Sequence, residues 1–338
     1  MKAIVLTKTG SANNAFEIRE LPTPQMGDND VLIKVAFSGL NFADVMARKG
    51  MYKAAPPLPS VLGYDVSGTV ESIGKNVINV ALGDQVFAIT RFGGYAEYAV
   101  CSGMAVAKVP AKIDMATATA LATQYSTAWF SAAEMVNLHE GETVLIHAAA
   151  GGVGTALTQY ALHKKCTVFA TAGSDEKVNI LQKVGVHVAI NYRKEKFEKV
   201  VMQKTDGKGI NVIFDAVGGK SVKTGIKSLS AGGIMVCYGA TEMSSGGQLQ
   251  YMKTAIQFGF YNPGLLTMAS KSIIGINMLH IADERPAMMK RTMDEVYKLA
   301  EQGIFKPVLG KVFGASEMGA AHAFLESRAS VGKVVVEW

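Results

Sequence analysis

The chain has 338 residues, of which 49% are hydrophobic and 18% are charged, and its formal net charge is +6. These values are typical of a globular chain long enough for two domains, and they exclude the disordered and fibrous classes. The lysines and arginines are scattered without a block of five or six, so we predict no nucleic-acid partner. No apolar run approaches the roughly 18 residues that a membrane span needs, and three widely spaced cysteines indicate buried free thiols, so we expect a cytoplasmic protein.

The first hundred residues predict short strands separated by Gly-Asp turns, a pattern typical of a folded-over barrel or sandwich. The expected strands are Lys2–Leu6, Glu17–Glu20, Val31–Ser38, Val66–Ile73, Gln85–Ile89, Tyr95–Val100 and Ala105–Val109. An alanine-rich stretch from Ala116 to Val136 then predicts one helix or two.

Strands and helices alternate in the next part of the chain, which predicts an α/β fold with a doubly wound parallel sheet. The expected strands are Thr143–Ala148, Thr167–Ala172, His187–Asn191, Asn211–Asp215, Gly233–Tyr238 and Ser272–Asn277. The expected helices are Gly154–Lys165, Asp175–Val184, Phe197–Thr205, Ser221–Leu229 and Leu249–Phe258. The last segment resembles the first part of the chain in its pattern. It predicts helices at Pro286–Gln302 and Met318–Ser327 and strands at Lys306–Phe313 and Gly332–Val336. We therefore predict a cofactor domain inserted between two parts of a catalytic domain.

A glycine-rich turn follows the first strand of the alternating part, at Ala149-Ala150-Gly151-Gly152-Val153-Gly154. A strand, a tight turn and a helix N-terminus in this order suit a dinucleotide pyrophosphate, because free backbone N–H groups face the phosphates. The spacing matches Gly-x-Gly-x-x-Gly only with Ala149 in place of the first glycine. Ordinary turn chemistry is the alternative interpretation.

The end of the next strand distinguishes between the two nicotinamide cofactors. An NAD site would place Asp or Glu there, roughly 20 residues past the glycines, but this chain has Ala172-Gly173-Ser174 with Lys177 one turn later. A hydroxyl, an exposed N–H and an ammonium suit the 2′-phosphate of NADPH. Asp175 and Glu176 are interpreted as acidic residues in the first turn of a helix. For Lys177, the alternative to a phosphate contact is an ordinary solvated lysine on that helix.

Over almost its full length the chain resembles the zinc-independent quinone oxidoreductases of the medium-chain dehydrogenase/reductase superfamily, including the vesicle-amine-transport-protein-1-like and zeta-crystallin-like members. The resemblance rests on the glycine turn and on three further motifs, which are Gly39-Leu-Asn41-Phe-Ala-Asp44-Val-Met-Ala-Arg48-Lys-Gly50-Met-Tyr52, Leu62-Gly63-Tyr64-Asp65-Val-Ser-Gly68 and Ala189-Ile-Asn-Tyr192. It implies a β-rich GroES-like catalytic domain at residues 1–125 plus 278–338. It also implies a Rossmann NADP-binding domain at residues 126–277.

The resemblance also implies the site residues. Asn41, Asp44 and Thr127 would approach the nicotinamide from the catalytic side, and Tyr238 and Gly239 would line its ribose side. The pyrophosphate would be held by Gly151, Gly152 and Val153, and the adenosine 2′-phosphate end by Gly173, Ser174, Lys177 and Tyr192, with Arg328 as a weaker addition. The alternative for Thr127 is an ordinary helix residue. The alternative for Tyr192 is an aromatic residue packed on the surface.

The zinc alcohol dehydrogenases of the same fold would have Cys or His near Asn41, at Tyr64 and near Thr123. None of these three residues is a Cys or His, so we predict no metal. Asn41, Tyr52 and Tyr64 are expected in the substrate pocket. In related enoyl-thioester reductases the tyrosine that matches Tyr52 is thought to protonate the substrate, and a packing role is the alternative here.

These observations predict an enzyme, an NADPH:quinone oxidoreductase-like protein that transfers hydride to a quinone or an α,β-unsaturated carbonyl. The alternatives are a 2-enoyl-thioester reductase and an NADPH-bound binding protein without catalysis. The expected partner is a small electrophilic substrate. The segment Lys271–Met278 is expected to be an apolar edge strand, and in the family the equivalent strand pairs across a two-fold axis, so we also expect a homodimer.

Overall fold

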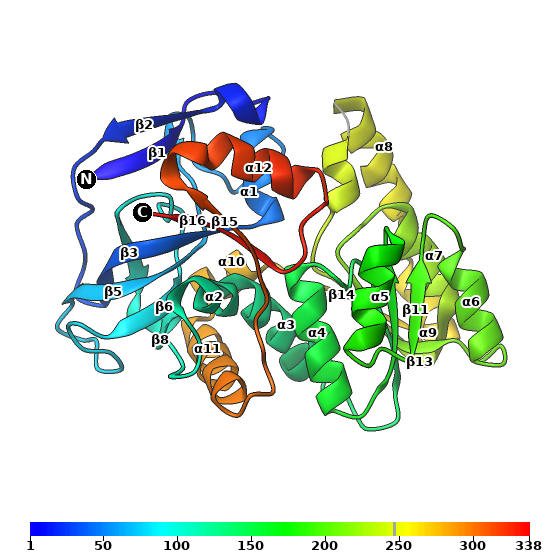
Figure 1. The fold of residues 1–338 in the computed structure, drawn as a ribbon. Coiled ribbons are helices and arrows are strands. Elements are labelled where there is room, and N and C mark those ends of the chain that lie inside the picture. The colour runs from blue at the N-terminus through cyan, green and yellow to red at the C-terminus, as the bar shows by residue number, and fades with distance from the viewer. Residues whose placement is uncertain (246–247) are drawn as a thin grey trace. The chain divides into compact units, whose positions relative to one another are not determined.

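The structure is a computed structural model that describes residues 1–245 and 248–338. The chain forms two compact units, residues 1–126 with 278–338 and residues 127–277, and each is described by itself. In Figure 1 the first unit contains both the blue and the red ends of the chain, and the second is green to yellow. The second unit is therefore an insertion in the sequence of the first.

Two sheets form the β-rich first unit. One has the strand order β2-β1-β4, and the other has the order β15-β16-β3-β5-β6-β8, with β7 also paired to β3. The strands are β1 Lys2–Leu6, β2 Phe16–Glu20, β3 Asp30–Leu40, β4 Ser60–Val61, β5 Asp65–Ile73, β6 Gln85–Ile89, β7 Tyr98–Ser102, β8 Val106–Lys108, β15 Leu309–Gly314 and β16 Lys333–Glu337. The C-terminal strand β16 pairs antiparallel with β3, so the last residues of the chain lie beside Phe37–Leu40.

The helices of the first unit are α1 Phe42–Arg48, α2 Met115–Ala120, α10 Met278–Glu284, α11 Pro286–Glu301 and α12 Met318–Glu326. Three short 3-10 helices accompany them, at Ala12–Asn14, Gly103–Ala105 and Ala315–Glu317. Apolar side chains from β1, β16 and α12 pack with Leu40 and Leu62 in one core cluster. A second cluster, mostly of valines from β3, β5 and β6, supports the larger sheet.

The stretch expected to be one or two helices alternates between two helical forms. After α2 the backbone is π-helical at Leu121–Tyr125, α-helical in α3 Ser126–Trp129, and π-helical again at Phe130–Met135. A π-turn is one residue wider than an α-turn, and the hydrophobic periodicity of a sequence does not reveal it.

A parallel sheet with the strand order β11-β10-β9-β12-β13-β14 forms the centre of the second unit. Its strands are β9 Thr143–Ile146, β10 Thr167–Ala172, β11 Val188–Asn191, β12 Ile210–Asp215, β13 Leu229–Cys237 and β14 Ser272–Gly275. Its helices are α4 Gly152–His163, α5 Asp175–Lys183, α6 Phe197–Lys204, α7 Lys220–Ser228, α8 Gln248–Phe258 and α9 Pro263–Ala269, with a 3-10 helix at Thr241–Ser245. The expected α/β fold with a doubly wound sheet is confirmed.

The strand order reverses direction between β9 and β12. The chain moves outward from β9 to β11 and then returns to place β12 on the other side of β9. In open parallel sheets a ligand binds at the carboxyl ends of the strands beside such a reversal. The glycine-rich turn leaves β9 at this end, so the fold places the turn where a dinucleotide would bind.

Candidate functional site

The glycine-rich turn brings the start of α4 against the end of β9. Ala148 has a left-handed backbone with φ 52°, and the helix begins at Gly152 after Gly151 as its N-cap. A Cβ on Gly154 would lie 2.5 Å from the Ala148 carbonyl oxygen, so only glycine allows this approach. Gly151, Gly152 and Val153 stay partly exposed, and the N–H groups of the first helical turn have no intrahelical acceptors. This backbone is suited to an anion.

The end of β10 brings three of the expected phosphate residues together. Ser174 is the N-cap of α5, and its hydroxyl accepts a hydrogen bond from the Lys177 N–H at 3.3 Å. Tyr192 follows β11, and its hydroxyl lies 2.5 Å from where a Cβ of Gly173 would be. Gly173 therefore allows the Tyr192 phenol to lie next to the cap of α5. Tyr192 is 43% exposed, which leaves it accessible to a ligand.

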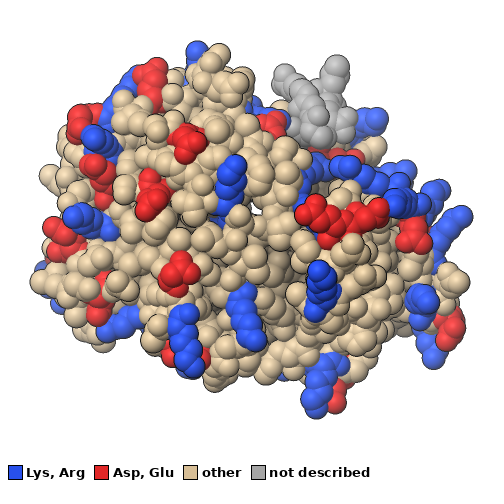
Figure 2. All heavy atoms as spheres, viewed as in Figure 1, with Lys and Arg blue, Asp and Glu red and all other residues tan. Residues whose placement is uncertain are grey.

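The acidic residue Asp175, which follows Ser174 at the start of α5, is paired with neighbouring groups. Asp175 accepts hydrogen bonds from Asn191 Nδ2 at 2.8 Å and Lys194 Nζ at 2.5 Å, and mainly the bond to Lys194 lowers its pKa. Burial lowers the pKa of Lys177, and the charge of Arg193 contributes to the same shift. Sequence reasoning did not single out Arg193 or Lys194, although a basic pair directly after Tyr192 was the available signal. In Figure 2, lysines and arginines are interspersed with acidic residues over the visible face.

Tyr238 and Gly239 follow β13 at the same end of the sheet. The Tyr238 N–H donates to the Asp215 carbonyl at 3.0 Å, and burial raises the pKa of the tyrosine. A Cβ on Gly239 would lie 2.9 Å from the Ala216 carbonyl oxygen, so glycine allows the two strand ends to approach. Beside them the buried Asp215 carboxylate accepts hydrogen bonds from Val217 and Gly218 N–H groups and from Ser221.

Two further expected cofactor residues, Thr127 and Arg328, belong to other elements. Thr127 lies in α3 and is 7% exposed. Arg328 follows α12 in the first unit, where it is exposed and has φ 61°. Their contact with a cofactor stays a prediction.

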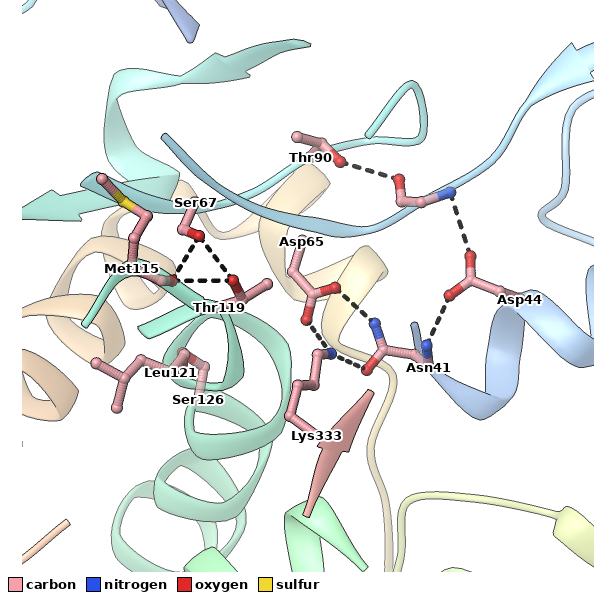
Figure 3. A network of polar contacts seen from close by, with 11 residues as sticks. Asn41, Asp44, Asp65, Ser67, Thr90, Met115, Thr119, Leu121, Ser126 and Lys333 are labelled. Atoms are coloured by element: carbon pink, nitrogen blue, oxygen red, sulfur yellow. Dashed lines mark hydrogen bonds and ion pairs between the residues drawn. The ribbon is translucent and has the colours of Figure 1, made fainter. Parts of the chain in front are cut away.

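A buried polar cluster in the first unit contains Asn41 and Asp44 (Figure 3). The Asn41 side chain donates from Nδ2 to Asp65 Oδ1 at 2.9 Å, and its Oδ1 accepts from Lys333 Nζ at 3.0 Å. Lys333 also pairs with Asp65 Oδ2 at 2.6 Å. Sequence reasoning missed Asp65 and Lys333, and the only signal for the latter was a lysine inside the apolar strand Lys333–Glu337.

Asp44 lies on the other side of Asn41 and is fully buried. Its carboxylate accepts from the N–H of Asn41 at 2.9 Å and from the N–H of Gly63 at 3.2 Å. Burial raises the pKa of Asp44 to about 7, and the charge of Asp65 adds to the shift, while the two backbone donors and Lys333 oppose it. The cluster therefore takes up a proton near neutral pH.

Three aromatic side chains of the first unit pack against one another, and one of them, Tyr64, directly precedes Asp65 of the polar cluster in sequence. The rings of Tyr52 and Tyr64 meet edge to face with centroids 6.2 Å apart, and Phe92 lies 5.0 Å from Tyr64. Burial raises the pKa of both tyrosines, so both phenols keep their protons at neutral pH. The Tyr64 hydroxyl is buried, and its interaction with the Tyr52 phenol contributes to the pKa shifts of both tyrosines.

The donors near these residues do not suit zinc. Asn41 offers an amide, Tyr64 a phenol and Thr123 a hydroxyl, whereas zinc in proteins is bound by Cys, His and carboxylates. The Asn41 oxygen already faces the Lys333 ammonium. Among residues 1–245 and 248–338, no group of three or more His, Cys, Asp or Glu side chains is arranged to hold a metal ion. No helix in the same described ranges is long and apolar enough to cross a membrane.

Comparison with protein families gives two matches. Residues 27–111 match the alcohol dehydrogenase GroES-like domain, and residues 152–294 match the zinc-binding dehydrogenase domain. With the doubly wound sheet and its glycine-rich turn, these matches define a medium-chain dehydrogenase/reductase.

Among curated relatives, a probable quinone oxidoreductase of Schizosaccharomyces pombe is 33% identical over 98% of this chain and 96% of the relative. The quinone oxidoreductase of Sus scrofa is 31% identical over 99% of this chain and 97% of its own. The chain thus belongs to the zinc-independent quinone oxidoreductase family and is an oxidoreductase of that type. A highly-reducing polyketide synthase of Aureobasidium melanogenum is 31% identical over 98% of this chain, which spans 14% of the length of that relative.

Solved structures show the same fold. The Escherichia coli quinone oxidoreductase complexed with NADPH has a TM-score of 0.87 and 26% identity, and covers 100% of both chains. A mycobacterial protein complexed with NADPH has a TM-score of 0.88 and 29% identity, also over 100% of both chains. The CurK enoyl reductase has a TM-score of 0.86 and 25% identity over 99% of this chain and 98% of its own.

Proposed function

We propose that this protein is an NADPH-dependent reductase that transfers hydride to a quinone or an α,β-unsaturated carbonyl. The observation that carries the proposal is the corner formed by Gly173, Ser174 and Tyr192, with Lys177 one helical turn further on. It offers hydroxyl and ammonium donors, and the nearby Asp175 is paired with Lys194. Such a corner favours a 2′-phosphate over a 2′-hydroxyl.

The other expected residues fit the rest of the cofactor. Gly151, Gly152 and Val153 would bind the pyrophosphate through the first turn of α4, and Tyr238 and Gly239 would line the nicotinamide-ribose side. Bound NADPH would supply the hydride. Asn41, Asp44 and Thr127 are proposed to contact the nicotinamide end, and Arg328 the phosphate end. The NADPH complexes of the two structural relatives support this cofactor.

The first unit is proposed to bind the acceptor through Asn41, Tyr52 and Tyr64. Aromatic faces at Tyr52, Tyr64 and Phe92 suit a planar conjugated acceptor. No metal is required, because a quinone or enone is already electron-poor, and hydrogen bonds suffice to stabilise the charge that develops on its oxygen.

Tyr52 supports a second candidate function, the reduction of a 2-enoyl thioester. Its pKa is raised by burial, so the phenol is protonated at neutral pH and can donate a proton to a carbanion or enolate. The likeness to CurK enoyl reductase is consistent with this reaction.

One experiment tests both functions. NADPH and NADH oxidation is measured with 1,2- and 1,4-quinones, a 2-alkenal and a crotonyl thioester, in the wild type and in Tyr52→Phe. We expect NADPH-dependent quinone turnover that the substitution leaves unchanged. Thioester or alkenal turnover that collapses in Tyr52→Phe would instead assign Tyr52 as the proton donor. NADPH binding without turnover of any acceptor would contradict the proposal and favour a binding protein.

A further inference from the structure

The Asn41 amide is held at both ends by groups of opposite charge. A lysine ammonium can only donate a hydrogen bond and a carboxylate can only accept one. Lys333 must therefore face the amide oxygen of Asn41, and Asp65 must face its nitrogen, as the distances of 3.0 Å and 2.9 Å show. Figure 3 shows both charged side chains converging on this amide. The amide thus has one orientation, without the flip that a neutral neighbour would permit.

The ion pair that holds the amide is packed tightly between strands. Asp65 and Lys333 are both 0% exposed and come from β5 and β16, the two strands that flank the end of β3. Gly39 of β3 pairs in register with Asp65. A Cβ on Gly39 would lie 2.4 Å from Lys333 Cε and 2.5 Å from Asp65 Oδ1, so the pair occupies the space that a side chain would take.

Burying such a pair carries a desolvation cost. Apolar residues of similar volume often replace a buried ion pair without loss of stability, so stability alone does not account for this one. The pair also determines which atoms of Asn41 stay available. One Nδ2 hydrogen is donated to Asp65, and no residue in the described parts of the chain accepts the other.

The neighbouring residues indicate where the second hydrogen would be used. Asn41 is mostly buried and keeps 9% of its surface exposed. Tyr64, which directly precedes Asp65, is 3% exposed, and its phenol interacts with the phenol of Tyr52. Buried polar groups are nearly always paired, so an amide whose second N–H has no acceptor among the described residues points to a ligand with an acceptor atom.

We propose that Lys333 and Asp65 are positioning residues, which orient Asn41 so that its second Nδ2 hydrogen is donated to the carbonyl oxygen of the acceptor. The inference rests on the proposed reductase function. When hydride adds to the conjugated carbon, the carbonyl π electrons move to the oxygen, and a preorganised N–H stabilises this charge. The oxyanion then takes its proton from solvent. Lys333 and Asp65 touch no substrate and act through Asn41.

The test is a cycle of variants. Lys333→Met with Asp65→Asn removes both charges of the ion pair together, so neither member of the pair is left buried without its partner. We expect kcat/KM for a 1,4-quinone to fall about 10- to 100-fold, mainly in kcat. Asn41→Ala should show a similar loss. Adding the pair substitution to Asn41→Ala should cost less than about two-fold more, because the pair acts only through Asn41.

A matched control separates positioning from stability. Val335→Ala changes the same strand at a residue that is also 0% exposed, and should lower the Tm without changing kcat/KM. Additive losses in the cycle, or an unchanged kcat/KM in the double variant, would overturn the proposal.

A second readout does not depend on turnover. With 15N-asparagine labelling and Asn41→Asp to assign the signal, the side-chain amide of Asn41 should exchange its hydrogens at least about ten-fold more slowly in the wild type than in the double variant. In the wild type, adding the quinone should shift the signal of the second hydrogen. Equal exchange in both proteins, or no shift, would contradict the positioning role. If no acceptor is turned over, the proposed function fails, while this measurement still decides how Asn41 is held.

Discussion

At the scale of single residues, the first unit contains a cluster of three buried ionisable side chains. Asp44, Asp65 and Lys333 are all 0% exposed, so two carboxyls share one cation. Asp65 is in direct contact with Lys333 at 2.6 Å, whereas Asp44 is held by two backbone N–H groups. The cluster is neutral when Asp44 is protonated. Burial is the main cause that raises the pKa of Asp44 to about 7, and the charge of Asp65 adds to it.

The raised pKa of Asp44 predicts a pH dependence of stability. Between the ordinary value of 3.8 and about 7, the folded chain binds more protons than the unfolded chain. The free energy of unfolding should therefore fall as pH rises through this window and level off above it. About three pKa units correspond to at most about 4 kcal/mol. Asp44→Asn should lose this slope in urea unfolding from pH 4 to pH 8.5, and equal slopes in both proteins would refute the explanation.

At the scale of elements, the N-terminus of α5 shows how two strand ends form one corner. Ser174 caps the helix, and Tyr192 comes from the end of β11, which pairs with β10. The fold brings these residues together because neighbouring parallel strands end at the same edge of a sheet. Lys177 sits one turn further along, and burial lowers its pKa.

This corner predicts a charge-dependent cofactor preference. Lys177→Ala should weaken NADPH binding by about 10-fold or more, because a charge-assisted hydrogen bond to the phosphate is lost, while NADH binding stays the same. Lys183→Ala, in the last turn of the same helix, is the matched control and should change neither. Fluorescence titration of both cofactors measures the effect. Equal weakening for NADPH and NADH would show that Lys177 does not face the 2′-phosphate.

Several elements were not expected from the pattern. The helix α1 has seven residues and β4 has two, so neither is long enough to show a period. The helices α9 and α10 were also missed, and β13 begins at Leu229, four residues before the expected strand. A register shift between Ile210 and Val212 in the pairing of β12 with β13 accompanies that early start. Tertiary pairing, and not local preference, extends the strand there.

At the scale of the whole molecule, the sheet of the second unit ends at a strand with one partner. Among the described strands, β14 pairs only with β13. Next to it along the chain, α9 exposes Leu265 at 67% and Met268 at 86%. An edge strand with exposed apolar neighbours is a surface that proteins normally cover.

We therefore propose that the protein is a homodimer, with β14 at the interface. A two-fold axis beside an edge strand allows the two copies to pair with each other. Light scattering at micromolar concentration should give twice the mass of one chain. A mass equal to one chain at every concentration would exclude this assembly.

The sequence by itself determined the features that depend on local order. The alternation of strands and helices, the glycine turn and the absence of an acid at the end of Thr167–Ala172 are all local patterns. The alternation predicted the fold class, whereas the family was expected from the resemblance of the glycine turn and three further motifs. The absence of Cys and His at Asn41, Tyr64 and Thr123 was equally readable, because it depends only on which residue follows which motif.

Only the tertiary structure decided which distant side chains meet. Lys333 lies 292 residues from Asn41 in sequence and reaches it because β16 pairs with β3. The phenol of Tyr192 lies over Gly173 because β11 pairs with β10, and Arg193 acts on Lys177 from the same strand end. Strand register sets these contacts, and register is decided by the packing of the whole sheet. Local patterning carries no information about it, which is why the charged partners of Asn41 emerged only from the fold.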